Sequence, residues 1–252
     1  MFFDTQHAPS LTTGIKSLDT LIGIRGIQRG SCLSLHVESD SLGSTLLTEI
    51  LSTSLSKACN TLVITDTEFT EITQNLELHG LPVSKGNFML MKPSVDLLDQ
   101  IEALQILSWP NLVISFFCNN LTNGIKSICE ACNLIGIEMT KKGESSDYAF
   151  EELVPAVDSN GHTFGTPFRI EFLNEPSNMT QSFALSTGRI HSIYDLFSAS
   201  VVAGILSFNS DGQIVAKTGK KFADSLDEAI YKISPIHVQA RLNDAIYRQL
   251  AS

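Results

Sequence analysis

The chain has 252 residues, 43% of them hydrophobic and 17% charged, which suffices for one large domain or for a core domain with a small appendage. Its formal net charge of −10 argues against a broadly basic nucleic-acid surface but leaves room for a local cationic groove. No apolar run has the length of a membrane span, and residues 1–10 do not resemble a signal peptide. We therefore expect a soluble, cytoplasmic protein.

Five cysteines occur, mainly in apolar contexts: Cys32, Cys59, Cys118, Cys129 and Cys132. The last two form a C-x-x-C pair, which is typical of a redox-active dithiol or of half a metal site. The sequence has no second pair and no suitably spaced histidine. Because free cysteines are usually buried, structural cysteines are expected.

The first part of the chain is predicted to be a short arm over residues 1–11. Phe2 and Phe3 in this arm would be exposed unless they dock on the chain's own core or form an interface with a neighbouring subunit. A short helix then begins after Thr12 or Thr13.

Uniformly apolar strand patterns alternate with helical patterns in the next part of the chain. Such an alternation indicates an α/β fold with a mostly parallel sheet and helices on both of its faces. The expected strands are 33–37, 61–65, 87–91, 111–118 and 133–140, and the expected helices are 43–58, 70–79, 94–107 and 121–131.

Residues 141–165 show no clear period, and a loop of this length is usually functional or mobile. Beyond it, the patterns predict a small C-terminal α/β lobe. Three segments are therefore expected, namely the arm at 1–11, a core at 12–187 and the lobe at 188–252. The predicted elements after the loop are strands at 168–173 and 181–185, a helix at 190–204, a strand pair within 204–215, and helices at 222–231 and 236–250.

The stretch Leu33–Thr45 reads as a buried strand, a polar turn and a helix opening at Gly43, which is where a nucleotide-binding P-loop would lie. A cradle of the form G-x-x-x-x-G-K-[ST] uses glycines for close backbone approach and a lysine against the phosphate charge. If Gly43 is the second glycine, Glu38 replaces the first, Ser44 replaces the lysine, and Thr45 keeps the hydroxyl.

Shifting the motif by one residue places Val37 at the first glycine, Leu42 at the second glycine and Gly43 at the lysine. Neither register supplies a cation, because no Lys or Arg occurs between Arg29 and Lys57. A helix N-terminus at Gly43–Thr45 would still offer N–H donors, so weak ATP and Mg²⁺ binding stays open although no cofactor is expected.

The order of these features resembles the RecA recombinase family, including its phage UvsX-type members. The resemblance rests on residues 13–19 (TGIKSLD) followed by Arg29-Gly30 and a strand, on residues 66–69 (DTEF), and on the run from Gly188 through GILSFNSDGQIVAKTGKKF to a final helix pair. It implies a RecA-like P-loop NTPase core with a C-terminal lobe, and it implies that Glu68 stands at the position of the catalytic glutamate.

The chain departs from this family at several functional positions. Ser115 stands where the family would have the Asp that helps to hold Mg²⁺, and Glu138-Met139 stand where it would have a phosphate-sensing Gln. The segment between those strands is too short for the first DNA-binding loop. The second loop would correspond to residues 141–165, which offer only Lys141 and Lys142 as cations.

Phosphoryl transfer depends on positioned cations, so ATP hydrolysis by this chain alone is not expected. Glu68 is then either a vestigial catalytic residue or a surface acid at a strand end. The favoured hypothesis is a catalytically inactive RecA-like protein of DNA recombination or repair. It would bind single-stranded DNA, an active recombinase or copies of itself, in a bacterial or phage-infected cell. Lys217, Lys220 and Lys221 are candidate DNA contacts, or else a solvated hairpin face.

Two further hypotheses are open. The fold could serve as a structural or interaction module, for instance in a phage-infected cell, with neither ATPase activity nor DNA binding. Alternatively, an unrelated hydrolase could use Glu68 with His79 or His36, but this hypothesis needs a nucleophile or a metal cluster that the sequence does not supply.

Overall fold

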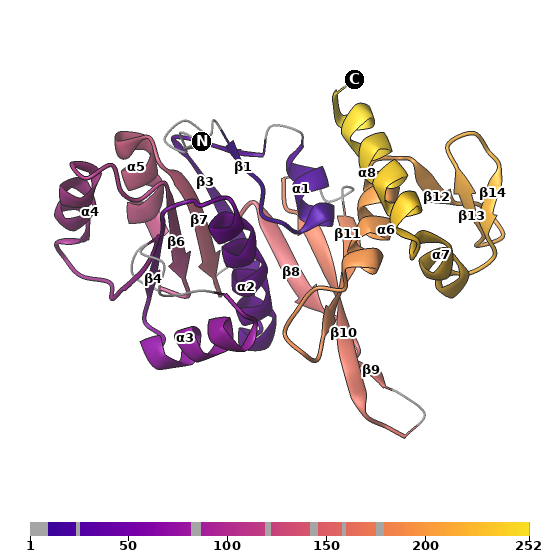
Figure 1. The fold of residues 1–252 in the computed structure, drawn as a ribbon, viewed down its shortest axis with the longest axis horizontal. Coiled ribbons are helices and arrows are strands. Elements are labelled where there is room, and N and C mark those ends of the chain that lie inside the picture. Colours follow the sequence, from indigo (N-terminus) through magenta and orange to yellow (C-terminus); the bar gives the residue numbers. More distant parts are fainter. Residues whose placement is uncertain are drawn as a thin grey trace. The chain divides into compact units, whose positions relative to one another are not determined.

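The computed structural model describes residues 10–23, 26–81, 87–118, 122–141, 146–157, 160–174 and 179–251. The roles predicted for Phe2, Phe3 and Lys142 fall on residues outside this set. Contacts divide the chain into two compact units, one made of residues 1–14 and 25–150 and the other of residues 15–24 and 151–252 (Figure 1). The predicted C-terminal lobe, from residue 188 onward, lies within the second unit.

The first unit is built on parallel strands in the order β8-β3-β7-β6-β4-β5. This order confirms the expected α/β class with a mostly parallel sheet. A small antiparallel pair, β1 (Ser10–Leu11) with β2 (Ile27–Gln28), accompanies it. The parallel strands are β3 (Ser31–Val37), β4 (Thr61–Thr65), β5 (Phe88–Met91), β6 (Leu112–Phe116), β7 (Ile135–Thr140) and β8 (Tyr148–Glu152).

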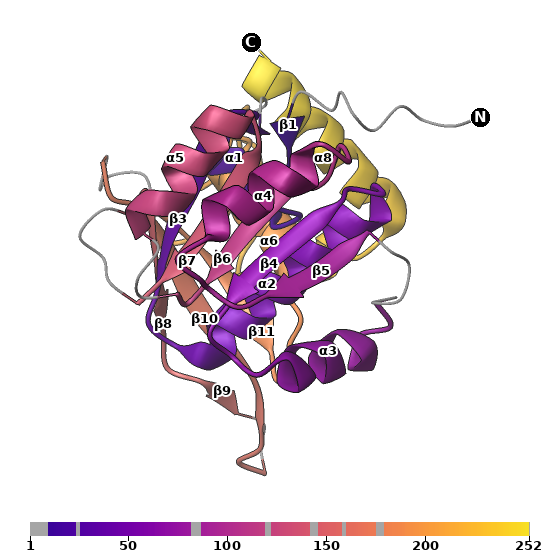
Figure 2. The ribbon, with the colours of Figure 1, turned by 90° about the vertical axis from the view of Figure 1, so that its left-hand side faces the viewer.

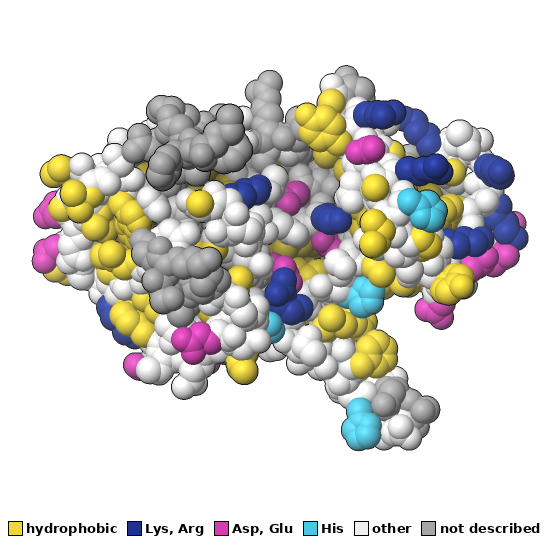
Figure 3. Space-filling model, viewed as in Figure 1, with side chains coloured by type: hydrophobic (Ala, Val, Ile, Leu, Met, Phe, Trp, Pro, Cys, Tyr) yellow, Lys and Arg dark blue, Asp and Glu magenta, His cyan; other side chains and the backbone are white. Residues whose placement is uncertain are grey.

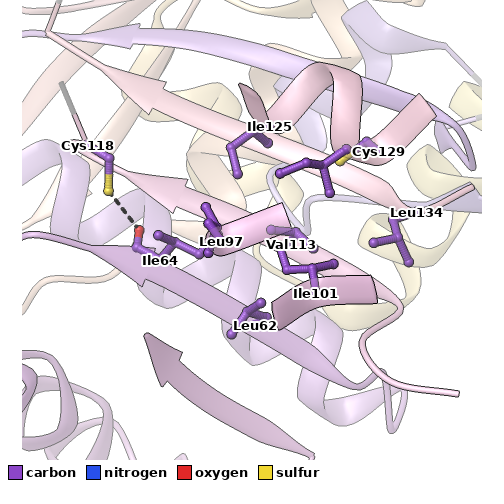
Figure 4. Packing of buried hydrophobic residues seen from close by; sticks show 10 residues of the cluster. Leu62, Ile64, Leu97, Ile101, Val113, Cys118, Ile125, Cys129 and Leu134 are labelled. Carbon is purple, nitrogen blue, oxygen red and sulfur yellow. Dashed lines mark hydrogen bonds between the residues drawn. The ribbon is translucent and has the colours of Figure 1, made fainter. Parts of the chain in front are cut away.

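Helices cover both faces of these strands, as uniformly apolar strands require. In Figure 1, α4 (Leu97–Gln105) and α5 (Thr122–Cys132) lie on one side of the strands, and α2 (Asp40–Ser56) lies on the other. Figure 2 shows α4 and α5 in front of the strands, with α3 (Phe69–Leu78) below. On the α4–α5 side, leucine, isoleucine and valine side chains from strands and helices pack together, with Leu97, Val113 and Ile101 in the middle of the cluster (Figure 4).

The second unit combines a long β-hairpin with a small lobe. The hairpin pairs β10 (Thr163–Phe172) with β11 (Met179–Leu185), and β9 (Ala156–Val157) adds to β10. The lobe packs three helices on a small antiparallel sheet around Leu196 and Phe197. The other elements of this unit are α1 (Lys16–Ile22), α6 (Ser192–Val202), β12 (Leu206–Phe208), β13 (Ile214–Ala216), β14 (Lys221–Ala223), α7 (Leu226–Ile233) and α8 (Ile236–Ala251).

The prediction of one long loop over residues 141–165 is wrong. β8, β9 and the start of β10 lie within that range. Tyr148 and Phe150 are buried on alternate positions of β8, but this two-residue period is too short to stand out in the sequence.

A buried carboxylate organises the N-terminal end of α1 in the second unit. Asp195 on α6 accepts hydrogen bonds from the backbone N–H of Lys16 (2.6 Å) and of Ser17 (3.2 Å), and from the hydroxyls of Ser17 and Ser182. Because α1 has no side-chain cap of its own, Asp195 satisfies N–H groups that would otherwise be orphaned. Burial raises the pKa of Asp195, while these hydrogen bonds act in the opposite direction.

Among the described residues, no helix combines the length and apolarity needed to cross a membrane.

Candidate functional site

The connection between β3 and α2 is too short to form a phosphate cradle. Only Glu38 and Ser39 separate the end of β3 from Asp40, where α2 begins. Ser39 is the N-cap, and its hydroxyl accepts a hydrogen bond from the Leu42 N–H at 3.3 Å. The prediction that the helix opens at Gly43 is therefore wrong, because a serine cap starts it three residues earlier.

Gly43, which has no side chain, leaves room for the aromatic ring of Phe117. A Cβ built at residue 43 would lie 2.4 Å from Cζ and 2.7 Å from Cε2 of Phe117. The Phe117 ring also packs on Phe116, with 4.4 Å between ring centroids. An aromatic ring thus lies against the first turn of α2.

A lysine from a distant part of the chain reaches the same helix end. Nζ of Lys141, directly after β7, lies 2.7 Å from Oδ1 of Asp40 and 5.2 Å from the centroid of the Phe117 ring. The sequence assigned Lys141 to DNA binding, whereas here it is engaged with an acid and an aromatic face. Asp40 would repel a phosphate that approached this lysine.

The other predicted nucleotide-binding residues do not converge on one point. The Thr45 side chain is buried and its hydroxyl donates to the carbonyl of Ser41 at 3.1 Å, within α2. Ser44 lines a cavity of about 100 Å³ that Thr67 and Glu71 also line. Glu38 lies in the turn, with its carboxylate 3.7 Å from Nε2 of His36.

Glu68 has the environment of a surface acid. Its side chain is 82% exposed, and its carboxylate lies 3.8 Å from Nζ of Lys92. Lys92 itself donates to the carbonyls of Asp66 and Thr67 at 2.9 Å each. For the hydrolase hypothesis, β4 and β3 are separated by β6 and β7, so their equivalent positions lie about 14 Å apart. The described residues contain no group of three or more His, Cys, Asp or Glu side chains placed to hold a metal.

The positions of the expected Mg²⁺ ligand and phosphate sensor are neighbours in the sheet. Ser115 on β6 pairs in register with Glu138 on β7. Both are buried, and Ser115 Oγ and Glu138 Oε1 have no hydrogen-bond partner in the described chain. Phe116, the next residue on β6, lines the cavity beside Ser44 on α2. Because successive side chains of a strand alternate between faces, Ser115 and Glu138 point away from α2, toward α5.

Glu138 is an acid near its point of half-protonation at neutral pH. Burial raises the pKa of its carboxyl to about 7, and the nearby Ser34 hydroxyl opposes part of this rise. Strongly perturbed carboxyls are enriched at functional sites, although structural networks perturb them too.

The C-terminal lobe carries a cationic groove of about 590 Å³. Three of its lining side chains are cationic, Lys217, Arg241 and Arg248, against the single acid Asp244. Figure 3 shows Lys and Arg side chains gathered over α8 and the adjoining small sheet. Seven of the 17 Lys and Arg residues lie within residues 188–252, but only six of the 27 acids do. The lobe therefore differs in charge from the acidic remainder of the chain.

Of the three lysines predicted for DNA binding in this lobe, only Lys217 lines the groove; its Nζ donates to Oε1 of Gln249 at 2.7 Å. Lys221 is paired with Asp224 at 2.7 Å, and this contact lowers the pKa of Asp224. Lys220 is exposed and is not part of the groove lining.

Sequence analysis missed Arg241 and Arg248. Their spacing of seven residues was the available signal, because residues two helical turns apart share one face. The C-x-x-C cysteines are free thiols, with Cys129 buried and Cys132 half-buried.

In comparisons with known proteins, no protein-family model matches the chain, and a search of curated proteins finds no match.

Proposed function

We propose that the protein is a catalytically inactive, RecA-like binding protein of DNA recombination or repair. It contacts single-stranded DNA through the cationic groove of its C-terminal lobe, in the cytoplasm of a bacterial or phage-infected cell. The observation that carries this proposal is the convergence of Lys217, Arg241 and Arg248 on one groove of an otherwise acidic chain.

The RecA-like part of the proposal rests on the order of motifs and on a compatible sheet. In the first unit, β3 leads into a helix of 17 residues, and β4 leads into the Asp66–Phe69 segment at the same edge of the parallel sheet. Ligands of open α/β sheets bind at this carboxyl edge.

Catalytic inactivity is supported by the closed N-terminus of α2. Phosphoryl transfer needs free backbone donors, a cation and Mg²⁺ held in place. At α2 the Ser39 hydroxyl caps the helix, the Phe117 ring packs on Gly43, and Asp40 neutralises the nearby lysine. Nucleotide binding here is expected to be weak at most.

The groove supplies the chemistry that a DNA backbone needs. Arginine and lysine side chains bind phosphate oxygens, and each neutralised phosphate of a single strand contributes about −0.7 to the slope of log K against log salt. Three cations therefore predict a slope of about −2.

Fluorescence anisotropy with a labelled oligothymidylate at low salt tests this assignment. The Arg241→Gln/Arg248→Gln variant is expected to lose about tenfold or more in affinity, since each arginine contributes a charged contact. The matched control is Lys221→Gln/Lys232→Gln, which removes the same charge from lysines paired with Asp224 and Glu228 outside the groove. Equal losses in both variants, or no binding by the wild type, would contradict the proposal.

A second candidate function, an interaction module without DNA binding, is favoured by one observation. Apolar side chains are strongly exposed around α4 in the first unit, with Val95 fully exposed, Ile106 85% exposed and Leu107 75% exposed. Exposed apolar groups of this kind mark partner surfaces, such as an active recombinase or a second copy. Light scattering tests whether the wild type associates with itself. Association that is lost in Ile106→Ser/Leu107→Ser, together with absent DNA binding, would favour this function.

A further inference from the structure

A row of oxygen-bearing side chains crosses the central strands of the first unit. Ser34 on β3 pairs in register with Glu138 on β7. On its other side, the Ser34 N–H donates to Oδ2 of Asp147 at 2.8 Å, and the Asp147 N–H donates to the Ser34 carbonyl at 2.8 Å. Ser34 therefore lies between Glu138 and Asp147 in this row, with neighbouring strands about 4.8 Å apart.

Ser34 and Glu138 lie on the α5 side of their strands. Ser34 and Cys32 occupy alternate positions on β3 and so share one face. A Cβ built at Gly136 on β7 would lie 2.6 Å from Sγ of Cys129 on α5 and 2.9 Å from Sγ of Cys32, so this face of the strands lies beneath α5. Glu138, two residues after Gly136 on β7, therefore lies on the same face, beneath α5.

The row is buried, and several of its polar atoms lack partners. Ser34 is 8% exposed, Glu138 is 5% exposed and Ser115 is fully buried. Within the described chain, Ser34 Oγ, Glu138 Oε1 and Ser115 Oγ have no partner in hydrogen-bond geometry, although the Ser34 hydroxyl lies close enough to Glu138 to lower its pKa. A buried unsatisfied polar atom costs roughly 1–3 kcal/mol, so three in one row call for a physical explanation.

We propose that Asp147, Ser34 and Glu138 bind a hard divalent cation, Mg²⁺ or Ca²⁺, with Ser115 as a neighbouring oxygen donor. Carboxylate and hydroxyl oxygens are the ligands these ions prefer, and two carboxylates balance a double positive charge. A buried carboxylate is stable when it coordinates a metal.

This cation site differs from the nucleotide-associated site that the sequence suggested. It lies under α5, on the opposite face of the sheet from α2 and Phe116. Its ligands come from β3, β7 and the residue before β8, so the ion joins three neighbouring strands. Its role is structural, and the proposed DNA groove does not depend on it.

Thermal unfolding of the full chain, after dialysis against EDTA and into chelator-free buffer, tests this proposal. Separate titrations with MgCl₂ and CaCl₂ distinguish the two ions, and NaCl at matched ionic strength controls for screening. At about 100 times Kd, the effective ion is expected to raise the Tm of the wild type by roughly 5 °C or more.

Two variants test whether the Tm shift arises from ion binding at the proposed site. Glu138→Gln keeps the side-chain shape but removes a charged ligand, and Ser34→Ala removes the hydroxyl with little change in packing. Both should lose most of the Tm shift, whereas the exposed acid variant Glu77→Gln should retain it. No shift with either divalent ion, a shift equalled by NaCl, or full retention in both variants would overturn the proposal. If Glu138→Gln does not fold, the Tm shift of Ser34→Ala alone tests the proposal.

Discussion

Gly43 lies in the first turn of α2, and its neighbour is the aromatic ring of Phe117. Glycine-to-alanine exchange inside an exposed helix normally stabilises by about 1 kcal/mol. Here the added Cβ would lie 2.4 Å from the Phe117 ring, and overpacking costs about 1–3 kcal/mol. The steric cost is therefore the larger of the two effects.

We predict that Gly43→Ala lowers the free energy of unfolding by about 1 kcal/mol in denaturant titrations. With Phe117→Leu in the background, which shortens the clashing side chain, the same change should be neutral or stabilising. The double-mutant cycle measures this coupling directly. If Gly43→Ala has the same effect in both backgrounds, the ring is not the cause.

The pKa of Glu138 makes stability depend on pH. The folded carboxyl titrates at about 7 and the unfolded one at 4.5, so between these values the folded state binds more protons than the unfolded state. Its contribution is fully present below pH 4.5 and is lost as pH rises through 7. With EDTA present, we predict that this loss reaches about 3 kcal/mol, at 1.36 kcal/mol per pKa unit.

Denaturant titrations between pH 5 and pH 8 measure this slope, and Glu138→Gln should flatten it. The variant should also gain stability relative to the wild type at the upper end of the range. A slope that persists unchanged in Glu138→Gln would assign the pH dependence to another group.

At the scale of elements, α1 depends on a carboxylate from α6. Replacing Asp195 by alanine leaves the N–H groups of Lys16 and Ser17 and the hydroxyl of Ser182 without their acceptor. We predict a loss of about 3 kcal/mol or more in unfolding free energy by urea titration, because several buried donors are orphaned at once. Asp211→Ala, at an exposed hairpin turn, is the control and should change stability by less than about 0.5 kcal/mol.

The order and type of elements were largely predictable, because uniformly apolar strands between helical patterns leave few alternatives to a parallel sheet. The start of α2 was misplaced because Ser39 is one of several polar residues able to cap. The strand after residue 147 was missed because only Tyr148 and Phe150 show its period.

Contacts between residues far apart in sequence could not be predicted. Asp195 reaches residues nearly 180 positions away. The row of Ser115, Glu138 and Ser34 exists only because β7 lies between β6 and β3 in the sheet. Strand order is set by the whole fold, so neither the partners of these residues nor their burial can be read from local patterns.

At the scale of the molecule, charge is distributed unevenly between the acidic body of the chain and the cationic lobe. A chain of net charge −10 repels DNA as a whole, so binding depends on the cations of the groove, and the counterions that their phosphate contacts release make it weaken with salt. We predict a slope of log K against log salt of about −2, which falls below about −1 in magnitude for Arg241→Gln/Arg248→Gln. Anisotropy titrations across a salt series measure both slopes, and an unchanged slope in the variant would place the contacts elsewhere.

The central claim is that this RecA-like protein binds DNA without using a nucleotide. The most direct test measures its affinity for single-stranded DNA with and without Mg-ATP. The closed end of α2, with its Ser39 cap, its Phe117 ring and its Asp40–Lys141 pair, predicts the same affinity in both conditions. DNA affinity that rises tenfold or more with Mg-ATP or an uncleavable analogue would contradict the account, because it would require a working nucleotide site.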